Sequence, residues 1–218
     1  MNGHVVFLDL DGVVVRGQSQ ALLLRFALSR GLVPPLRGAA LLLGIALGLP
    51  ARGFAADRLH GQGARAVESF SEARLAAILE SFWDACLSAR LTDAGRGILR
   101  RHRALGDTVV LHSAAIEPLV ALVARRLDIP QWFGTVLECC DSRYTGRVAG
   151  APNRGREKVR RAAALLEAAG LPRARTTAYS DSHSDLPLLE WAAHPVAALP
   201  DWRLGREARR RGWPVIPR

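Results

Sequence analysis

Two aspartates stand two residues apart near the start of the chain, where a short apolar segment ends. The segment runs from His4 to Leu8, and Asp9 and Asp11 follow it. A short apolar run with β-branched and aromatic residues is typical of a buried strand, and side chains two residues apart on a strand leave the same face. Two such carboxylates repel each other unless a divalent cation offsets their charge, and oxygen ligands suit Mg²⁺. The pattern therefore predicts a magnesium site here, although turns after strands are rich in Asp in any case.

Ser113 and Lys158 are candidates for binding an anion. Ser113 follows the apolar run Thr108 to Leu111. Its hydroxyl could hold a phosphate oxygen near a helix N-terminus, or it could cap a helix that we expect to begin near Ala115. Lys158 is the only lysine among 30 basic residues. One retained lysine favours a site that needs a compact point charge, with chance survival as the alternative.

A third group of acids follows the apolar segment Thr176 to Tyr179. Asp181 is placed to complete a metal site, and Asp185 follows it by one helical turn. Asp185 could orient either Lys158 or water bound to the metal. His183 lies between the two acids, and we expect it at the surface or on the rim of the site, because Asp11 already supplies an acid/base group.

The elements that must position these residues alternate between strand and helix. We expect strands at His4 to Leu8, Thr108 to Leu111 and Thr176 to Tyr179, and helices at Ala94 to Ala104, Ile116 to Leu127 and Arg156 to Ala169. Ser142 to Val148 is expected to form a small hairpin or edge segment with a turn at its end. This alternation predicts an α/β fold with a parallel sheet and a site beyond the carboxyl ends of its strands.

Residues 18–91 interrupt this alternation, because they are rich in leucine and alanine and lack a clear strand. We expect an inserted α-helical cap at 18–91 and a Rossmann-like core at 1–17 and 92–218. The most apolar part, Ala39 to Leu49, is 11 residues long, whereas a membrane-spanning helix needs about 20. It is either a helix buried in the cap or an interfacial segment, flanked by Arg37 and Arg52, that gives peripheral membrane contact or admits an apolar substrate.

Composition narrows the classes of partner. The net charge of +10 reflects either a solvated arginine-rich surface or attraction to an anionic partner. No zinc-finger, RNP or bZIP pattern accompanies it, so no specific nucleic-acid binding is expected.

The three cysteines, Cys86, Cys139 and Cys140, fit reduced thiols better than a disulfide framework. With no signal-peptide pattern before Asp9, a cytoplasmic location is expected. Oligomeric state is left open.

In order, context and approximate spacing, these residues resemble the four motifs of the haloacid dehalogenase (HAD) superfamily. The resemblance covers roughly residues 4–16 and 93–217. Further segments are similar to subfamily IB hydrolases, the relatives of phosphoserine phosphatase: Tyr144 to Arg147, Tyr179 to Ser182, Leu186 to Leu189, and the tail from His194 to Pro214. The resemblance implies a HAD core with a cap of the C1 type.

This resemblance also implies a mechanism. Asp9 would attack phosphorus and become an aspartyl phosphate, while Asp11 acts as general acid and then general base. Mg²⁺ would be held by Asp9, the main-chain carbonyl of Asp11, and Asp181. Ser113 and Lys158 would neutralise the phosphoryl oxygens. The expected substrate is a phosphorylated small metabolite or a phospholipid-like phosphate.

The sequence departs from the family pattern at two positions. Val13 stands where many relatives have Thr or Ser, and Ser184 stands where relatives often have Asn. Neither change removes a principal catalytic group. Two alternatives to a phosphatase remain: a phosphotransferase that uses the same intermediate, and a non-catalytic basic module that binds nucleic acid or anionic membrane.

Overall fold

The centre of the computed structural model, which describes residues 3–33 and 64–218, is a six-stranded parallel sheet. The strand order is β3-β2-β1-β6-β7-β8. From β1 the chain builds β2 and β3 on one side and later β6 on the other, so the strand order reverses at β1. Open α/β sheets bind ligands at such a reversal, beyond the carboxyl ends of the strands. The strands are β1 (Val5–Leu8), β2 (Thr108–Ile116), β3 (Gln131–Thr135), β6 (Thr176–Ser180), β7 (His194–Ala198) and β8 (Val215–Ile216).

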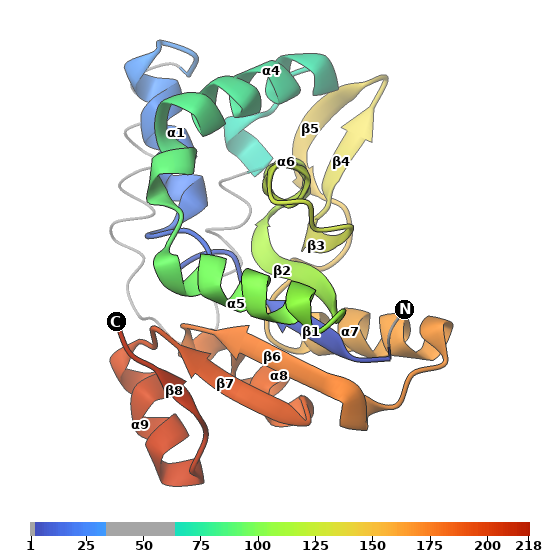
Figure 1. Ribbon diagram of the computed structural model, residues 1–218. Coiled ribbons are helices and arrows are strands. Elements are labelled where there is room, and N and C mark those ends of the chain that lie inside the picture. Colours follow the sequence, from blue (N-terminus) through green and yellow to red (C-terminus); the bar gives the residue numbers. More distant parts are fainter. Residues whose placement is uncertain (1–2, 34–63) are drawn as a thin grey trace.

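Helices cover both faces of this sheet, as Figure 1 shows. Alternate residues of β1 face opposite sides: Val6 and Leu8 lie in the hydrophobic cluster of α5 and α6, and Val5 and Phe7 lie in that of α7, α8 and α9. The predicted α/β fold is confirmed. The bounds are α5 (Asp93–Ala104), α6 (Glu117–Arg126), α7 (Arg156–Ala169), α8 (Leu186–Trp191) and α9 (Trp202–Arg211).

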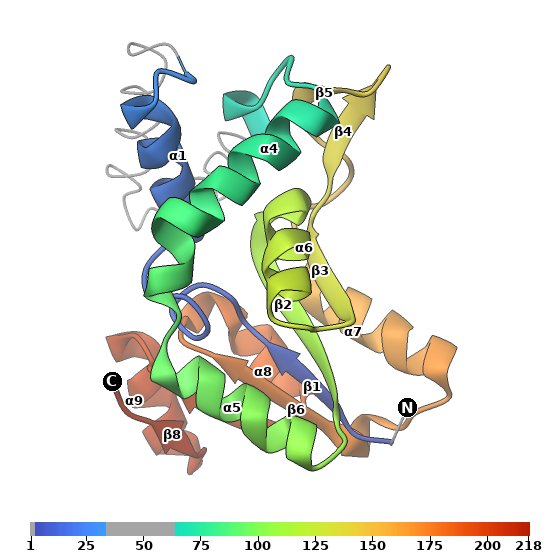
Figure 2. The same cartoon turned by 45° about the horizontal axis from the view of Figure 1, so that its top comes forward.

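The described residues between 18 and 91 are mainly helical. α1 (Ser19–Ser29) packs against α4 (Glu72–Phe82), with the rings of Phe26 and Phe82 5.5 Å apart. A π-helical turn, η1 (Trp83–Leu87), and a 3₁₀ turn, η2 (Ser88–Arg90), then lead down to α5 (Figures 1 and 2). The apolar segment Ala39 to Leu49, with Arg37 and Arg52, lies outside the described residues. The division into core and cap stays a prediction.

Two segments of the chain connect this helical part to the sheet, and main-chain hydrogen bonds join the two segments. The amide of Arg16 donates to the carbonyl of Arg90 at 2.8 Å, and the amide of Thr92 donates to the carbonyl of Val14 at 2.9 Å. The Thr92 hydroxyl donates to the carbonyl of Val13 and caps α5 by accepting from the amide of Gly95. The segment after β1 is therefore fixed beside the start of α5.

Three sequence predictions need correction. β2 does not end at Leu111 but continues to Ile116, because its last residues pair with β3 across an irregular register. Consequently α6 begins at Glu117 rather than near Ala115. The predicted hairpin consists of β4 (Leu137–Cys140) and β5 (Arg143–Val148), and its turn at Asp141 and Ser142 lies at the start of the predicted segment instead of at its end. Two short 3₁₀ turns, η3 (Arg173–Arg175) and η4 (His183–Asp185), complete the described elements.

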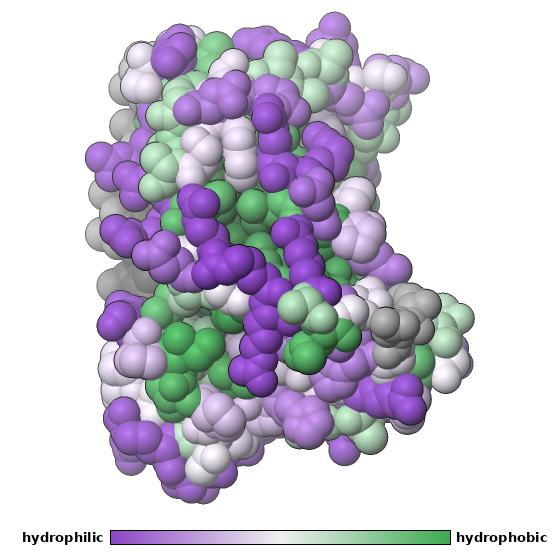
Figure 3. Space-filling view, viewed as in Figure 1, coloured by the Kyte–Doolittle hydropathy of each residue, from purple (hydrophilic) through white to green (hydrophobic). Residues whose placement is uncertain are grey.

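Hydrophilic side chains cover most of the face drawn in Figure 3, and hydrophobic side chains show in smaller patches between them. Across residues 3–33 and 64–218, no helix combines the length and the apolar character that crossing a bilayer requires.

Candidate active site

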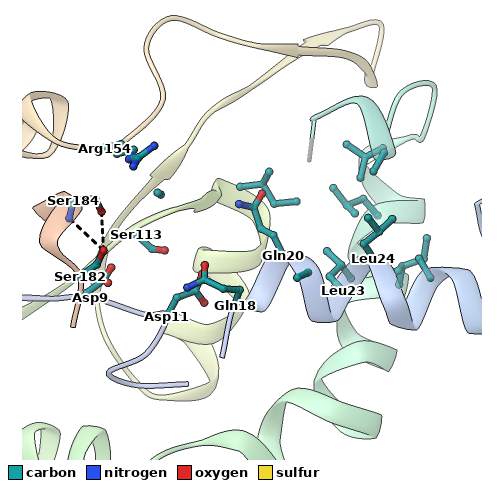
Figure 4. A pocket seen from close by; sticks show the side chains of 18 of the residues that line it. Asp9, Asp11, Gln18, Gln20, Leu23, Leu24, Ser113, Arg154, Ser182 and Ser184 are labelled. Atoms are coloured by element: carbon teal, nitrogen blue, oxygen red, sulfur yellow. Dashed lines mark hydrogen bonds between the residues drawn. The ribbon is translucent and has the colours of Figure 1, made fainter. Parts of the chain in front are cut away.

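The predicted residues meet at the carboxyl ends of three neighbouring strands. Asp9 directly follows β1, Ser113 lies in β2, and Asp181 directly follows β6. α7 contributes Lys158 from beyond the sheet. All four line one cavity of about 380 Å³, together with Asp11 and Asp185. Figure 4 shows Asp9, Asp11 and Ser113 at this cavity.

Lys158 lies between two carboxylates. Its Nζ donates to Asp9 Oδ1 at 2.9 Å and to Asp185 Oδ2 at 2.6 Å, and the hydroxyl of Ser180 also donates to Asp185 Oδ2. Lys158 is only 1% exposed. Burial alone would lower the pKa of Lys158, but Asp185 and Asp9 raise it above its ordinary value. The ammonium therefore stays charged and is aimed at Asp9. Contact with Lys158 is one of the two roles predicted for Asp185, and orientation of metal-bound water stays a prediction.

Asp9 itself is 8% exposed. Burial, with smaller contributions from Asp185 and Asp181, raises its pKa well above the ordinary range, although Lys158 acts in the opposite direction. A carboxylate in this position is poorly hydrated and depends on nearby positive charge. A site of this kind is suited to a nucleophile that works beside a cation.

Asp11 faces the start of α1. The amide of Ser19 donates to Asp11 Oδ1 at 2.9 Å. Burial raises the pKa of Asp11 to about 6, and the hydrogen bond from Ser19 limits the rise. A carboxyl group with such a pKa can both hold and release a proton near neutral pH, which general acid/base chemistry requires.

Asp181 lies against the main chain of Gly12. A Cβ atom at Gly12 would come within 1.8 Å of Asp181 Oδ2, and the φ of Gly12 is +78°. Only glycine leaves room for the carboxyl group in this conformation. Burial, followed by the charges of Asp185, Asp11 and Asp201, raises the pKa of Asp181 to about 7.

The donor set fits a hard divalent cation. The cavity is lined by four carboxyl groups, those of Asp9, Asp11, Asp181 and Asp185, and Lys158 contacts only two of them. A cation near Asp9 and Asp181 would offset the remaining negative charge. In the described part of the chain, no three His, Cys, Asp or Glu side chains are grouped as a metal site by themselves. A ligand set made of Asp9, Asp181 and the main-chain carbonyl of Asp11 stays a prediction.

Ser113 does not cap α6, because that helix starts at Glu117 after Ile116. Its hydroxyl instead accepts from the amide of Ala115 at 3.1 Å inside β2. The main-chain carbonyl of Ser113 accepts from Asn153 Nδ2 at 2.9 Å. The serine is thus held in place at the cavity wall by a residue in the loop before α7.

Three other residues named from the sequence lie around the site. Ser184 lines the cavity, with its hydroxyl 3.1 Å from that of Ser182 (Figure 4). Val13 is fully buried in the hydrophobic core. His183 does not line the cavity, and its amide donates to Asp201 Oδ2 at 2.9 Å.

Several lining residues carried no recognisable sequence signal. Arg154, in the loop before α7, faces the cavity near Ser184, and Gln18, Gln20 and Leu24 face it from the other side (Figure 4). One arginine in an arginine-rich chain, or one leucine in a leucine-rich helix, cannot be recognised from the sequence as a lining residue. Asn153, which is fully buried and donates to the carbonyl of Ser113 behind the cavity wall, was also missed.

Known proteins are similar to this chain in sequence and in structure. A Bordetella pertussis protein of unknown function has a similar structure, with a TM-score of 0.84 and 30% identity over 97% of each chain. A phosphoserine phosphatase of Mycobacterium tuberculosis is 37% identical over 68% of this chain and 48% of its own length. A histidinol-phosphatase of Neisseria meningitidis is 32% identical over 67% of this chain and 68% of its own length.

The chain therefore spans about half the length of the mycobacterial relative. The model of the haloacid dehalogenase-like hydrolases matches residues 6–190, a range that contains every candidate catalytic, phosphate-binding and metal-binding residue described above. This chain belongs to the haloacid dehalogenase-like hydrolase family.

Proposed function

We propose that this chain is a Mg²⁺-dependent phosphatase that hydrolyses a phosphate monoester through an aspartyl phosphate on Asp9. The observation that carries the proposal is the contact of Lys158 Nζ with Asp9 Oδ1, 2.9 Å long and buried at the end of a cavity. The phosphatase names of the relatives support a phosphorylated small-molecule substrate.

In the first step, a carboxylate oxygen of Asp9 attacks phosphorus as the bond to the ester oxygen breaks. Asp11, whose pKa of about 6 leaves it partly protonated near neutral pH, gives its proton to the departing alkoxide. In the second step, Asp11 accepts a proton from water as the water oxygen attacks the aspartyl phosphate. Inorganic phosphate and free Asp9 result.

Lys158 and Ser113 have electrostatic roles in both steps. The Lys158 ammonium and the Ser113 hydroxyl would hold non-bridging phosphoryl oxygens, where negative charge must be accommodated as the nucleophile approaches. Mg²⁺, held by Asp9, Asp181 and the carbonyl of Asp11, would supply further positive charge to the same oxygens. Arg154 adds a second cationic side chain at this end of the cavity.

The activity can be tested by measuring phosphate release from an aryl phosphate, phosphoserine and a lysophospholipid phosphate. We expect release from at least one ester with Mg²⁺, its loss in EDTA, and its recovery when excess Mg²⁺ is restored. Release that is unaffected by EDTA would contradict the metal requirement. If no phosphate is released from any of the three esters, the result would favour the non-catalytic basic module.

The raised pKa values predict how metal binding depends on pH. Asp181 and Asp11 have pKa values of about 7 and about 6 in the fold, against about 3.9 when unfolded. Between pH 4 and pH 7 the folded metal-free chain therefore holds protons that the unfolded chain has lost, so its free energy of unfolding falls as pH rises. At pH 5 only about 1% of Asp181 would be ionised, which weakens Mg²⁺ binding by roughly 100-fold relative to pH 8.

We accordingly expect Mg²⁺ to raise the melting temperature by several degrees at pH 8 and hardly at all at pH 5, since a ligand that binds only the folded state stabilises it. Thermal unfolding at both pH values, with Mg²⁺ and with EDTA, measures this. Equal shifts at pH 5 and pH 8 would contradict the assignment of Asp181 to the metal site.

Phosphoryl transfer to an alcohol remains a second candidate, because the same aspartyl phosphate can react with an acceptor other than water. Adding alcohols to the assay and looking for new phosphate esters separates transfer from hydrolysis. Residues 39–49, for which peripheral membrane contact is one expectation, lie outside the described residues, and a cytoplasmic location stays a prediction.

A further inference from the structure

The cavity has two chemically different ends. The end formed by the sheet carries Asp9, which Lys158 contacts, whereas apolar side chains such as Leu23 and Leu24 of α1 line the other end (Figure 4). Gln18 and Gln20 lie between the two ends. The apolar lining comes from α1, from Val33 after it, from the segment before α4, from α4 itself and from β2, and it includes Leu23, Leu24, Phe70, Leu75 and Ile78.

Among the described lining residues, charge is confined to the end that would hold phosphate. Within the described lining, every charged residue belongs to the segment after β1, to the loop before α7, to α7, or to the segment after β6, and α1 and α4 contribute none. The cation of Arg154 lies in that loop, near Ser184. A substrate whose phosphate occupies the charged end must therefore direct the rest of its structure toward the uncharged end.

This arrangement disfavours a zwitterionic leaving group. The ammonium of an amino acid would have to leave water for a wall in which the described residues of α1 and α4 offer it no carboxylate. An unpaired ion in such a place costs enough to weaken binding by at least about 100-fold. In contrast, each buried methylene group strengthens binding by roughly fourfold.

We propose that the site takes phosphate monoesters of uncharged, apolar alcohols, with the hydrocarbon part lying between α1 and the residues from Phe70 to Ile78. The inference rests on the phosphatase activity proposed above and specifies its substrate class. It separates this chain from the phosphoserine specificity that the name of its mycobacterial relative implies for that relative. The shared chemistry is a phosphate on a hydrocarbon chain, whether the ester is dissolved or part of a lipid.

The test compares kcat/KM for isobutyl phosphate and phosphoserine, which share a branched four-atom skeleton, whereas only phosphoserine carries the two carboxylate oxygens and the charges of the zwitterion. We expect isobutyl phosphate to be preferred by at least about 100-fold. In the series ethyl, butyl and hexyl phosphate, kcat/KM should rise with chain length, by up to roughly fourfold per methylene group, until the cavity is full. A preference for phosphoserine, or no dependence on chain length, would overturn the inference while leaving the phosphatase activity intact. If none of these esters nor an aryl phosphate is hydrolysed, it is the proposed function that fails.

Matched variants locate the effect in α1. Leu24→Gln places an amide in the apolar lining, so the ratio of kcat/KM for hexyl and ethyl phosphate should fall by about tenfold. Leu28→Gln makes the same change on the same helix at a residue outside the lining, and the ratio should not change.

Ala27→Leu fills space instead of adding polarity, and should lower turnover of hexyl phosphate but not of ethyl phosphate. Equal ratios in the wild type and all three variants would overturn the inference even if one variant is unstable, because the ratio is independent of the amount of folded protein.

Phosphatidate in phosphatidylcholine vesicles distinguishes the two sources of such an ester. Release from vesicles as fast as from hexyl phosphate assigns a membrane lipid, and release from hexyl phosphate alone assigns a dissolved ester. Both results support an apolar leaving group.

Discussion

Asp9→Asn is expected to reduce phosphate release by at least about 1000-fold, because an amide oxygen is a far weaker nucleophile than a carboxylate. The replacement has the same shape, and Lys158 keeps its contact with Asp185, so the fold should persist. Steady-state phosphate release and circular dichroism of the same preparations measure the two effects.

Asp141→Asn is the matched control. Asp141 is exposed in the turn between β4 and β5, and its φ of +48° is tolerated by Asn. This variant should turn over as fast as the wild type. Activity of Asp9→Asn within tenfold of the wild type would mean that the nucleophile has been wrongly assigned.

Lys158→Met is expected to lower kcat/KM by about 100- to 1000-fold, because the site loses a preorganised positive charge beside the reacting phosphoryl group. The methionine side chain has nearly the same length but leaves Asp9 and Asp185 without their shared partner. Like charges buried without a partner destabilise a fold, so the melting temperature in EDTA should also fall.

Two further variants show whether charge alone is sufficient at this position. Lys158→Arg retains the charge, but its planar guanidinium does not fit the space of a compact ammonium between two carboxylates, so activity should remain low. Arg156→Met removes a positive charge from an exposed position of the same helix and should have little effect. A Lys158→Met variant that keeps more than a tenth of wild-type activity would contradict the role assigned to the ammonium.

The parts of the fold that local signals specify were predictable from sequence. α7 was predicted to the residue, since Gly170 in the left-handed conformation ends it. β1 was clear because an apolar run stops at two aspartates. Lys158 stood out as the only lysine, and the resemblance to the HAD motifs implied a role for it beside the phosphoryl group; the structure puts its Nζ 2.9 Å from Asp9 Oδ1.

Features that depend on long-range pairing were not predictable in this way. β2 extends past Leu111 because Phe133 and Thr135 of β3 lie beside it, and no residue near Ser113 encodes that neighbour. The direction in which Leu24 and Arg154 face depends on how α1 and the loop before α7 are placed against the sheet. Composition could indicate an apolar helical region but not which of its leucines line the cavity.

The central claim, that Asp9 carries the phosphoryl group between two steps, is tested most directly by quenching the reaction in acid. The protein would be mixed with Mg²⁺ and a radiolabelled ester from the active panel, quenched during steady turnover, digested and analysed by mass spectrometry. We expect phosphate on the peptide that contains Asp9. Hydroxylamine should release this phosphate, as it does from acyl phosphates, and the Asp9→Asn variant should not carry it. Steady ester hydrolysis with no phosphate on that peptide, together with undiminished turnover by Asp9→Asn, would contradict the central claim.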